Sequence, residues 1–229
     1  YGFVENKQSF DTIGPLARDV ETTAKVLEAI SGPDARDPSA SHVQIDGIAE
    51  NLDDYQDLTF GVVENILTLA DDPVADQINT LVSILRDESP VSVTTTTLEL
   101  DNVDFAYSLI GTENTWRVRE SFITRGHGVQ YNEALQAALA DAEFSKHIAH
   151  RMLPGALLDE KTNGKSYIYA RQKAIEFSKK LSALFEDVDI LLTPTHRILP
   201  PELGVLQSSE DNIKYTFTKP FSLYNGPVV

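Results

Sequence analysis

The sequence contains no cysteine in its 229 residues. This absence excludes disulfide frameworks, cysteine nucleophiles and thiolate metal sites. Long apolar runs are missing as well, since none approaches the ~20 residues that a membrane-spanning helix needs. The first ten residues also lack the basic start and the apolar middle of a signal peptide. We therefore expect a cytoplasmic protein with no membrane partner.

Basic side chains are scarce, because 19 lysines and arginines stand against 35 acidic residues and leave a net charge of -16. Such a charge repels phosphate backbones and anionic lipid headgroups, so nucleic-acid and membrane partners are disfavoured. The acidic residues occur along the whole chain in pairs such as Asp53-Asp54, a pattern typical of a solvated surface. The hydrophobic fraction of 41% is ample for a folded core.

Apolar periodicity predicts a chain in which helices and strands alternate. Helices are expected within residues 14–32, 74–85, 103–120, 132–153 and 166–185. Strands are expected at residues 58–63, 91–98 and 188–192, and the apolar run at 217–229 reads as the beginning of another. The first two strands flank a helix, which suits a βαβ unit with parallel strands. Residues 33–57 have the composition of a surface connection.

Few residues suggest catalysis by their spacing. Lys165 and Ser166 are adjacent, but neighbours on a helix do not face each other, so a helix-capping role for Ser166 is favoured over a catalytic dyad. Asp187 and Asp189 bracket the entry of an apolar strand and are expected to be structural. Glycine-rich phosphate-binding loops are absent. The chain itself is therefore predicted to hold no catalytic residue and to need no cofactor.

Histidine spacing gives the only hint of a metal site. His147 and His150 lie three residues apart on an expected helix, a spacing that suits two ligands of one metal. The flanking Lys146 and Arg151 instead favour a solvated helix face. No metal site is predicted.

Four segments together resemble the later part of the amidase signature family. They are residues 9–18 (SFDTIGPLAR), 32–37 (GPDARD), 187–195 (DVDILLTPT) and 217–227 (FTKPFSLYNGP). The resemblance implies an α/β fold, with a mixed sheet flanked by helices, and the hydrolysis of carbon–nitrogen bonds in linear amides. In this family a serine attacks the amide carbonyl, assisted by a second serine and a lysine.

In the family all three catalytic residues precede the first of these segments, and no position of this chain matches them. We therefore expect them upstream of Tyr1 and interpret the chain as an incomplete, carboxyl-terminal piece that is inactive alone. Its expected parts are the tail of the amidase core at residues 1–40, a helical and βαβ substrate-side subdomain at 41–165, and a return to the core at 166–229. Its expected partners are a missing amino-terminal half or a second copy.

The resemblance also implies a substrate-binding set. Thr195 and His196 follow the strand that ends near the substrate cleft, so they are expected to line the pocket for the acyl or leaving group of a small-molecule amide. Phe221 and Tyr224 are expected close to the same cleft. For each of the four residues the alternative is a packing or turn role.

Two other functions stay open at this point. One branch of the family is the glutaminase subunit of glutamyl-tRNA(Gln) amidotransferase, in which an arginine on the long helix grips the glutamine carboxylate. Ala174 takes that position here, and Arg171 lies one turn earlier. This departure favours a general amidase acting on small or aryl amides. The third interpretation is a non-catalytic module that keeps the fold for binding or assembly.

Overall fold

The computed structural model describes residues 7, 10–36, 43–121, 133–134, 137, 146–200, 217–224 and 226. They form two compact units, each made of two stretches of the chain. The first unit comprises Tyr1–Asp54 and Ser108–Ala170, and the second comprises Tyr55–Tyr107 and Arg171–Val229. The subdomain boundaries expected near residues 40 and 165 stay a prediction.

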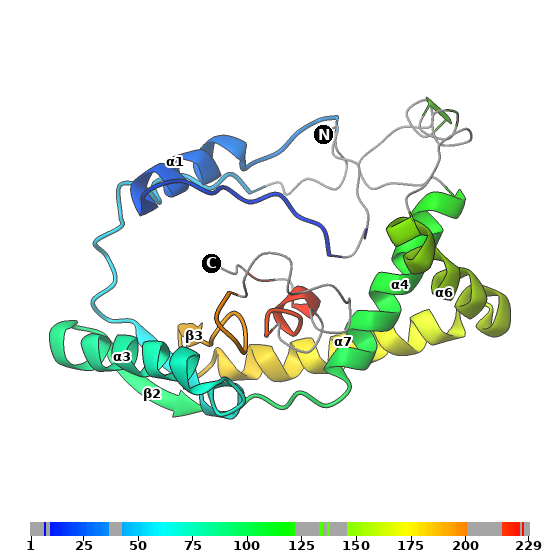
Figure 1. Ribbon diagram of the computed structural model, residues 1–229. Helices are drawn as coiled ribbons and strands as arrows, with labels where there is room; N and C mark the ends of the chain where they lie inside the picture. The colour runs from blue at the N-terminus through cyan, green and yellow to red at the C-terminus, as the bar shows by residue number, and fades with distance from the viewer. Residues whose placement is uncertain are drawn as a thin grey trace. The chain divides into compact units, whose positions relative to one another are not determined.

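Helices and strands are interspersed along the chain (Figure 1). In order they are α1 (Val20–Ile30), β1 (Thr59–Val63), α2 (Glu64–Leu67), α3 (Asp72–Glu88), β2 (Ser92–Thr96), α4 (Val103–Ser121), α6 (Lys146–Thr162), α7 (Lys165–Leu184), β3 (Ile190–Leu192) and the 3-10 helix η1 (Phe221–Leu223). The α/β class is confirmed, as are the three internal strands. No helix among the described residues combines the length and apolar character that crossing a bilayer requires.

The second unit is built on a three-stranded sheet in the order β2-β1-β3. Strand β1 pairs in parallel with both neighbours, with Gly61 opposite Thr94 on one side and Leu191 on the other. The parallel pairing of β1 and β2 through α3 confirms the predicted βαβ unit.

Two residues set how closely β3 approaches β1. A Cβ added at Gly61 would lie only 3.1 Å from Val188 and 3.2 Å from Leu191, so the absence of a side chain allows the close approach. Asp189 donates its backbone N–H to the Thr59 carbonyl at 2.9 Å and accepts the Thr59 N–H on Oδ2 at 2.7 Å. The carboxylate of Asp189 thus has a structural role at the start of the strand pair.

The core of the second unit lies where α2, α4 and α7 meet the segment after β2. Its buried members are Val63, Ile66, Leu98, Val103, Phe177 and Leu181. Within it the Asn65 side chain holds Leu98 in place by accepting the Leu98 N–H at 3.0 Å and donating to the Leu98 carbonyl at 2.8 Å. The Asn65 side chain thus forms with Leu98 the two hydrogen bonds that a residue of a neighbouring strand would form.

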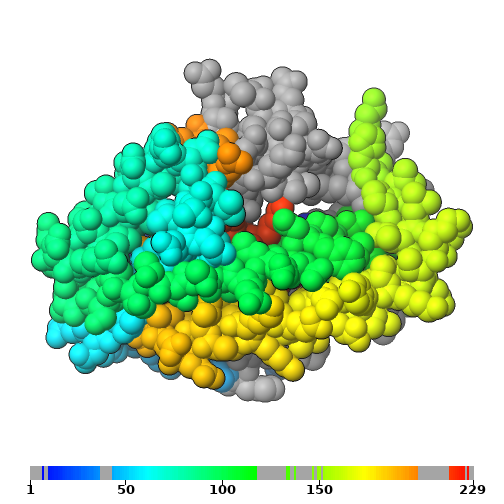
Figure 2. Space-filling model, turned by 90° about the horizontal axis from the view of Figure 1, so that it is seen from below, coloured from blue at the N-terminus to red at the C-terminus, as the bar shows by residue number. Residues whose placement is uncertain are grey.

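Helix α3 covers little of this core. Pro73 lies in its first turn, where a missing N–H costs nothing, and Arg86 lies in its last turn. Val82 is its one fully buried residue. Figure 2 shows the surface of this cyan-to-green stretch of the chain. The buried face of α3 is therefore narrow, and Leu81, which precedes Val82, remains 39% exposed.

In the first unit, α1 begins at a side-chain cap. The Asp19 carboxylate accepts the Thr22 N–H at 2.6 Å, and the helix ends at Ile30 before Ser31 and Gly32. The Glu28 side chain accepts the Ala49 N–H at 3.0 Å and so connects the helix to the segment around residue 49. The helix predicted within residues 14–32 is confirmed.

Helices α4 and α6 approach closely at Gly155. A Cβ there would lie 2.5 Å from the Trp116 Cβ and 2.6 Å from the Thr112 carbonyl oxygen, so glycine is required for this contact. The expectation that the helix would end at Leu153 is wrong, because α6 continues through Pro154 to Thr162. Proline removes one backbone donor, a loss that a helix packed this tightly tolerates.

The closing segment differs from expectation as well. Residues 221–223 form the 3-10 helix η1, not part of a strand. Pro220 precedes it in a helical conformation, with φ -54° and ψ -43°, and lacks the N–H that a sheet ladder needs.

Candidate functional site

The four predicted binding residues belong to two segments of the second unit, both close to the end of β3. Pro194 is buried directly after the strand, and the next residues, Thr195 and His196, are exposed. The Thr195 carbonyl accepts the Phe217 N–H at 3.0 Å, which ties the two segments together. Because the strands are parallel, their carboxyl ends share this edge, where open α/β sheets commonly bind ligands.

Phe221 and Tyr224 lie at the two ends of the turn that contains η1. Both are half-buried and pack against the core cluster of the second unit. The Tyr224 ring stacks on Phe185 with centroids 5.7 Å apart and an angle of 22° between the ring planes. Part of each side chain is therefore engaged in packing, as the alternative interpretation expected.

Lys219, which the sequence analysis did not single out, lies between Phe217 and Phe221 in the sequence. It is 8% exposed, and its Nζ lies 3.1 Å from Oδ1 of Asp104, whose side chain is 82% exposed. The pair places a cation inside the apolar segment while its counter-ion faces solvent. The signal in the sequence is a lysine between two aromatic residues, flanked by proline.

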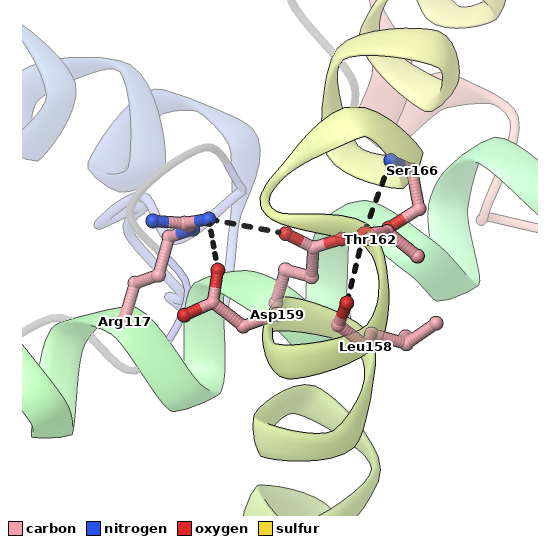
Figure 3. Close-up of polar contacts among 6 residues, drawn as sticks. Arg117, Leu158, Asp159, Thr162 and Ser166 are labelled. Atoms are coloured by element: carbon pink, nitrogen blue, oxygen red, sulfur yellow. Dashed lines mark hydrogen bonds and ion pairs between the residues drawn. The ribbon is translucent and has the colours of Figure 1, made fainter.

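A second polar cluster lies in the first unit, where α4 faces the junction of α6 and α7 (Figure 3). Glu113 is fully buried and accepts a short hydrogen bond from the Ser166 hydroxyl. The Thr162 hydroxyl lies 2.9 Å from Ser166 Oγ and donates to the Leu158 carbonyl at 2.8 Å. Polar groups from three helices thus converge on one buried carboxylate.

Arg117 connects this cluster to the surface. Its guanidinium lies 2.6 Å from Asp159 Oδ1 and 3.5 Å from Glu113 Oε2. The Asp159 contact is a hydrogen bond, whereas the longer Glu113 contact is an ion pair only. Figure 3 shows Arg117 and Asp159 pointing toward each other.

This arrangement gives Ser166 a structural role. Its hydroxyl donates to Glu113 and lies 2.9 Å from the Thr162 hydroxyl, while the adjacent Lys165 is exposed. Ser166 lies in the first turn of α7, where its backbone N–H donates to the Thr162 hydroxyl at 3.4 Å. The capping side chain is therefore that of Thr162 and not that of Ser166. Lys165 and Ser166 therefore do not form the dyad that their adjacency suggested.

Sequence reasoning missed Glu113, although a signal exists. Val103, Ala106 and Ile110 are buried at helical spacing, and Glu113 and Asn114 continue the same face. A charged residue in register with a buried apolar stripe predicts a buried polar contact.

The structure describes only one side chain of the histidine pair. His150 is exposed on α6, and the side chain of His147 lies outside the described residues. In the part of the chain that the structure describes, no three histidine, aspartate or glutamate side chains are grouped to hold a metal ion.

Known proteins resemble both the sequence and the fold. The A subunit of glutamyl-tRNA(Gln) amidotransferase from Halobacterium salinarum is 28% identical over 246 residues, covering 100% of this chain and 56% of that protein. The protein of the same name from Saccharolobus solfataricus is 27% identical, covering 89% of this chain and 44% of the relative. The chain spans about half the length of the curated relatives it matches.

Solved structures share the fold at lower identity. The A subunit of the Thermotoga maritima glutamyl-tRNA(Gln) amidotransferase superposes with a TM-score of 0.65 at 18% identity, covering 97% of this chain and 46% of that one. A bacterial aryl acylamidase of the amidase signature family gives a TM-score of 0.65 at 14% identity, with 92% and 44% covered. The family model described as Amidase matches residues 1–225, so the chain belongs to the amidase family.

Proposed function

We propose that this chain forms the carboxyl-terminal body of an amidase that hydrolyses carbon–nitrogen bonds in linear amides. The observation that carries the proposal is the family match over residues 1–225. In the proposal, a serine, a second serine and a lysine from outside these 229 residues perform the bond cleavage. Amide hydrolysis needs a nucleophile, a base and donors to the developing oxyanion, and in the proposal the nucleophile and the base come from those outside residues.

This chain contributes substrate binding in the proposal. Thr195 and His196 line the pocket for the acyl or leaving group, and Phe221 and Tyr224 form an apolar wall. The position of Thr195 and His196 after β3, at the carboxyl edge of a parallel sheet, supports this assignment. Exposed polar groups beside half-buried aromatic rings suit a small or aryl amide, because such a substrate combines one polar amide group with apolar substituents.

An assay with 4-nitroacetanilide tests the proposal. The purified 229-residue chain is expected to release no 4-nitroaniline, whereas the longer polypeptide that includes the preceding residues releases it steadily. Turnover by the 229-residue chain, lost in Ser166→Ala, would overturn the assignment of catalysis to outside residues. The preceding sequence gives a faster check, because a glycine- and serine-rich stretch with a lysine well before it is expected there. Without such a stretch, the non-catalytic interpretation is favoured.

Variants of the longer polypeptide test the binding residues. His196→Ala is expected to raise KM severalfold, because a pocket residue contributes to binding. Arg197→Ala is the matched control, since Arg197 is exposed next to His196 and forms its contact with Asp71 at 3.0 Å. Equal kinetic effects of the two variants would contradict the pocket assignment.

The names of the curated relatives favour a second candidate, an amidotransferase subunit that draws ammonia from glutamine. Ala174 is 4% exposed and lies on the α7 face that also buries Ala170 and Phe177, while Arg171 is exposed. Arg171 therefore does not replace, on that face, the arginine that grips glutamine. Release of ammonia from glutamine by the longer polypeptide, without hydrolysis of the aryl amide, would reverse the order of the two candidates.

A further inference from the structure

Helix α1 has an apolar face that the described residues of the first unit cover only in part. Val20, Leu27 and Ile30 fall on one side of the helix at a rotation of about 100° per residue, together with Ala24. Of these, Ala24 alone is buried, whereas Val20 is 70% and Ile30 is 53% exposed. A helix with an apolar stripe normally packs that stripe against a partner.

The chain leading into α1 extends the same exposed surface. Ile13 is 66% exposed and Leu16 is fully exposed, just ahead of the Asp19 cap. We call Ile13, Leu16, Val20 and Ile30 the α1 apolar surface. Large side chains exposed together in one short segment mark an interaction surface.

Neighbouring residues of the first unit contact another side of α1. The Glu28 carboxylate accepts the Ala49 N–H at 3.0 Å, and the Gln44 side chain reaches the Glu28 carbonyl at 3.5 Å. Glu28 lies beside Ala24 on the helix surface, which agrees with the burial of Ala24. Residues 44–49 thus leave Val20 and Ile30 open.

We propose that the α1 apolar surface is the docking site for the part of the same polypeptide that lies outside these 229 residues. The inference rests on the proposed function. The chain covers 56% of the Halobacterium salinarum relative and 44% of the Saccharolobus solfataricus relative, so roughly half of each has no counterpart here. A second copy is the weaker occupant, because two chains of net charge -16 repel each other.

The absence of cysteine makes a labelling experiment direct. Ile30→Cys places a single thiol on the α1 apolar surface, and Ala29→Cys is the matched control, because Ala29 is exposed on the polar side of the same helix. In the 229-residue chain both thiols are expected to react with a maleimide at similar rates. In the longer polypeptide, Cys at position 30 is expected to react at least tenfold more slowly, while Cys at position 29 keeps its rate. Peptide mass spectrometry assigns the labelled position.

Two results would overturn the inference. One is an equal labelling rate at positions 29 and 30 in the longer polypeptide. The other is protection of position 30 in the 229-residue chain that grows with protein concentration, which would identify a second copy as the occupant. Hydrolysis of 4-nitroacetanilide is measured in the same samples. Hydrolysis with an open position 30 contradicts the docking site alone, and protection without hydrolysis contradicts the proposed function alone.

Discussion

The two units bury very different amounts of apolar surface. Among the described residues, the first unit has three buried hydrophobic residues, Ala24, Ile110 and Ala170, and two of them are alanines. The second unit has twelve, including the large side chains of Ile66, Phe177 and Leu181. Burial of one large apolar side chain contributes about 1.5–3 kcal/mol, so the second unit holds most of the hydrophobic stabilisation of the described residues.

The two units also differ in how many of their buried polar atoms lack a hydrogen bond. Within the described part of the chain, three buried side-chain atoms accept or donate no hydrogen bond, namely Glu113 Oε2, Asn114 Nδ2 and Trp116 Nε1. All three belong to the first unit. A buried polar atom without any partner costs about 1–3 kcal/mol, although Glu113 Oε2 forms an ion pair with Arg117. Among the described residues, the first unit therefore buries fewer large apolar side chains than the second and contains the buried polar atoms that form no hydrogen bond.

Truncation of a buried side chain tests the difference between the two units most directly. Phe177→Ala is expected to lower the free energy of unfolding of the second unit by about 3–5 kcal/mol, because Phe177 is 3% exposed. Ile30→Ala in the first unit is the matched control and is expected to change stability by less than about 0.5 kcal/mol in the 229-residue chain. Urea unfolding measures both losses, with amide exchange of β1 reporting the second unit and the fluorescence of Trp116 reporting the first. Equal losses would show that the units share one core.

The buried carboxylate provides the next test. Ser166→Ala removes the hydroxyl that donates to Glu113, and the expected loss is about 1–3 kcal/mol. Trp116, the single tryptophan, belongs to the same unit, so its fluorescence reports the transition. Ser182→Ala on the exposed end of α7 is the control. If Ser166→Ala leaves the free energy of unfolding unchanged, the hydrogen bond to Glu113 contributes little to stability.

Much of the fold could be predicted because it depends on local pattern. Val74, Ile78 and Leu85 mark α3 by their spacing, and the apolar run at residues 58–63 marks β1. The failures depend on tertiary contacts. α6 continues past Pro154 where Gly155 meets α4, and nothing local to residues 146–162 reveals that contact.

The candidate site was harder to derive than the elements. The family motifs led to Thr195 and His196, and the end of β3 can be read from Pro194, but the tie to Phe217 is a backbone hydrogen bond between residues 22 positions apart. Such a bond leaves no side-chain signal. The burial of Lys219 and Glu113 is likewise invisible in composition, since both residue types are usually exposed.

Salt tests a charge difference within the second unit. Residues 55–107 contain ten acidic residues and one arginine, whereas residues 171–229 have seven of each sign. Raising sodium chloride from about 0.1 M to 1 M shortens the screening length from about 10 Å to 3 Å, so repulsion within residues 55–107 weakens and the melting temperature rises. The double variant Asp76→Lys, Asp87→Lys is expected to respond less. A falling melting temperature would mean that ion pairs such as Lys180 with Glu99 dominate.

The smallest expected effect concerns the cap of α1. The Thr22 backbone N–H bonded to Asp19 holds the pKa of that carboxyl below its ordinary value of 3.8. A carboxyl whose pKa is lowered by folding stabilises the folded state above its unfolded pKa, and this stabilisation is lost as the pH falls through the folded pKa. The protection of the α1 amides, measured relative to the intrinsic exchange rate at each pH, should therefore fall below about pH 4. Asp19→Asn keeps a capping oxygen without a titrating group, so the protection of its α1 amides should depend less on pH. An identical pH profile for both proteins would assign the effect to another group, and α1 would then owe its stability to residues other than its cap.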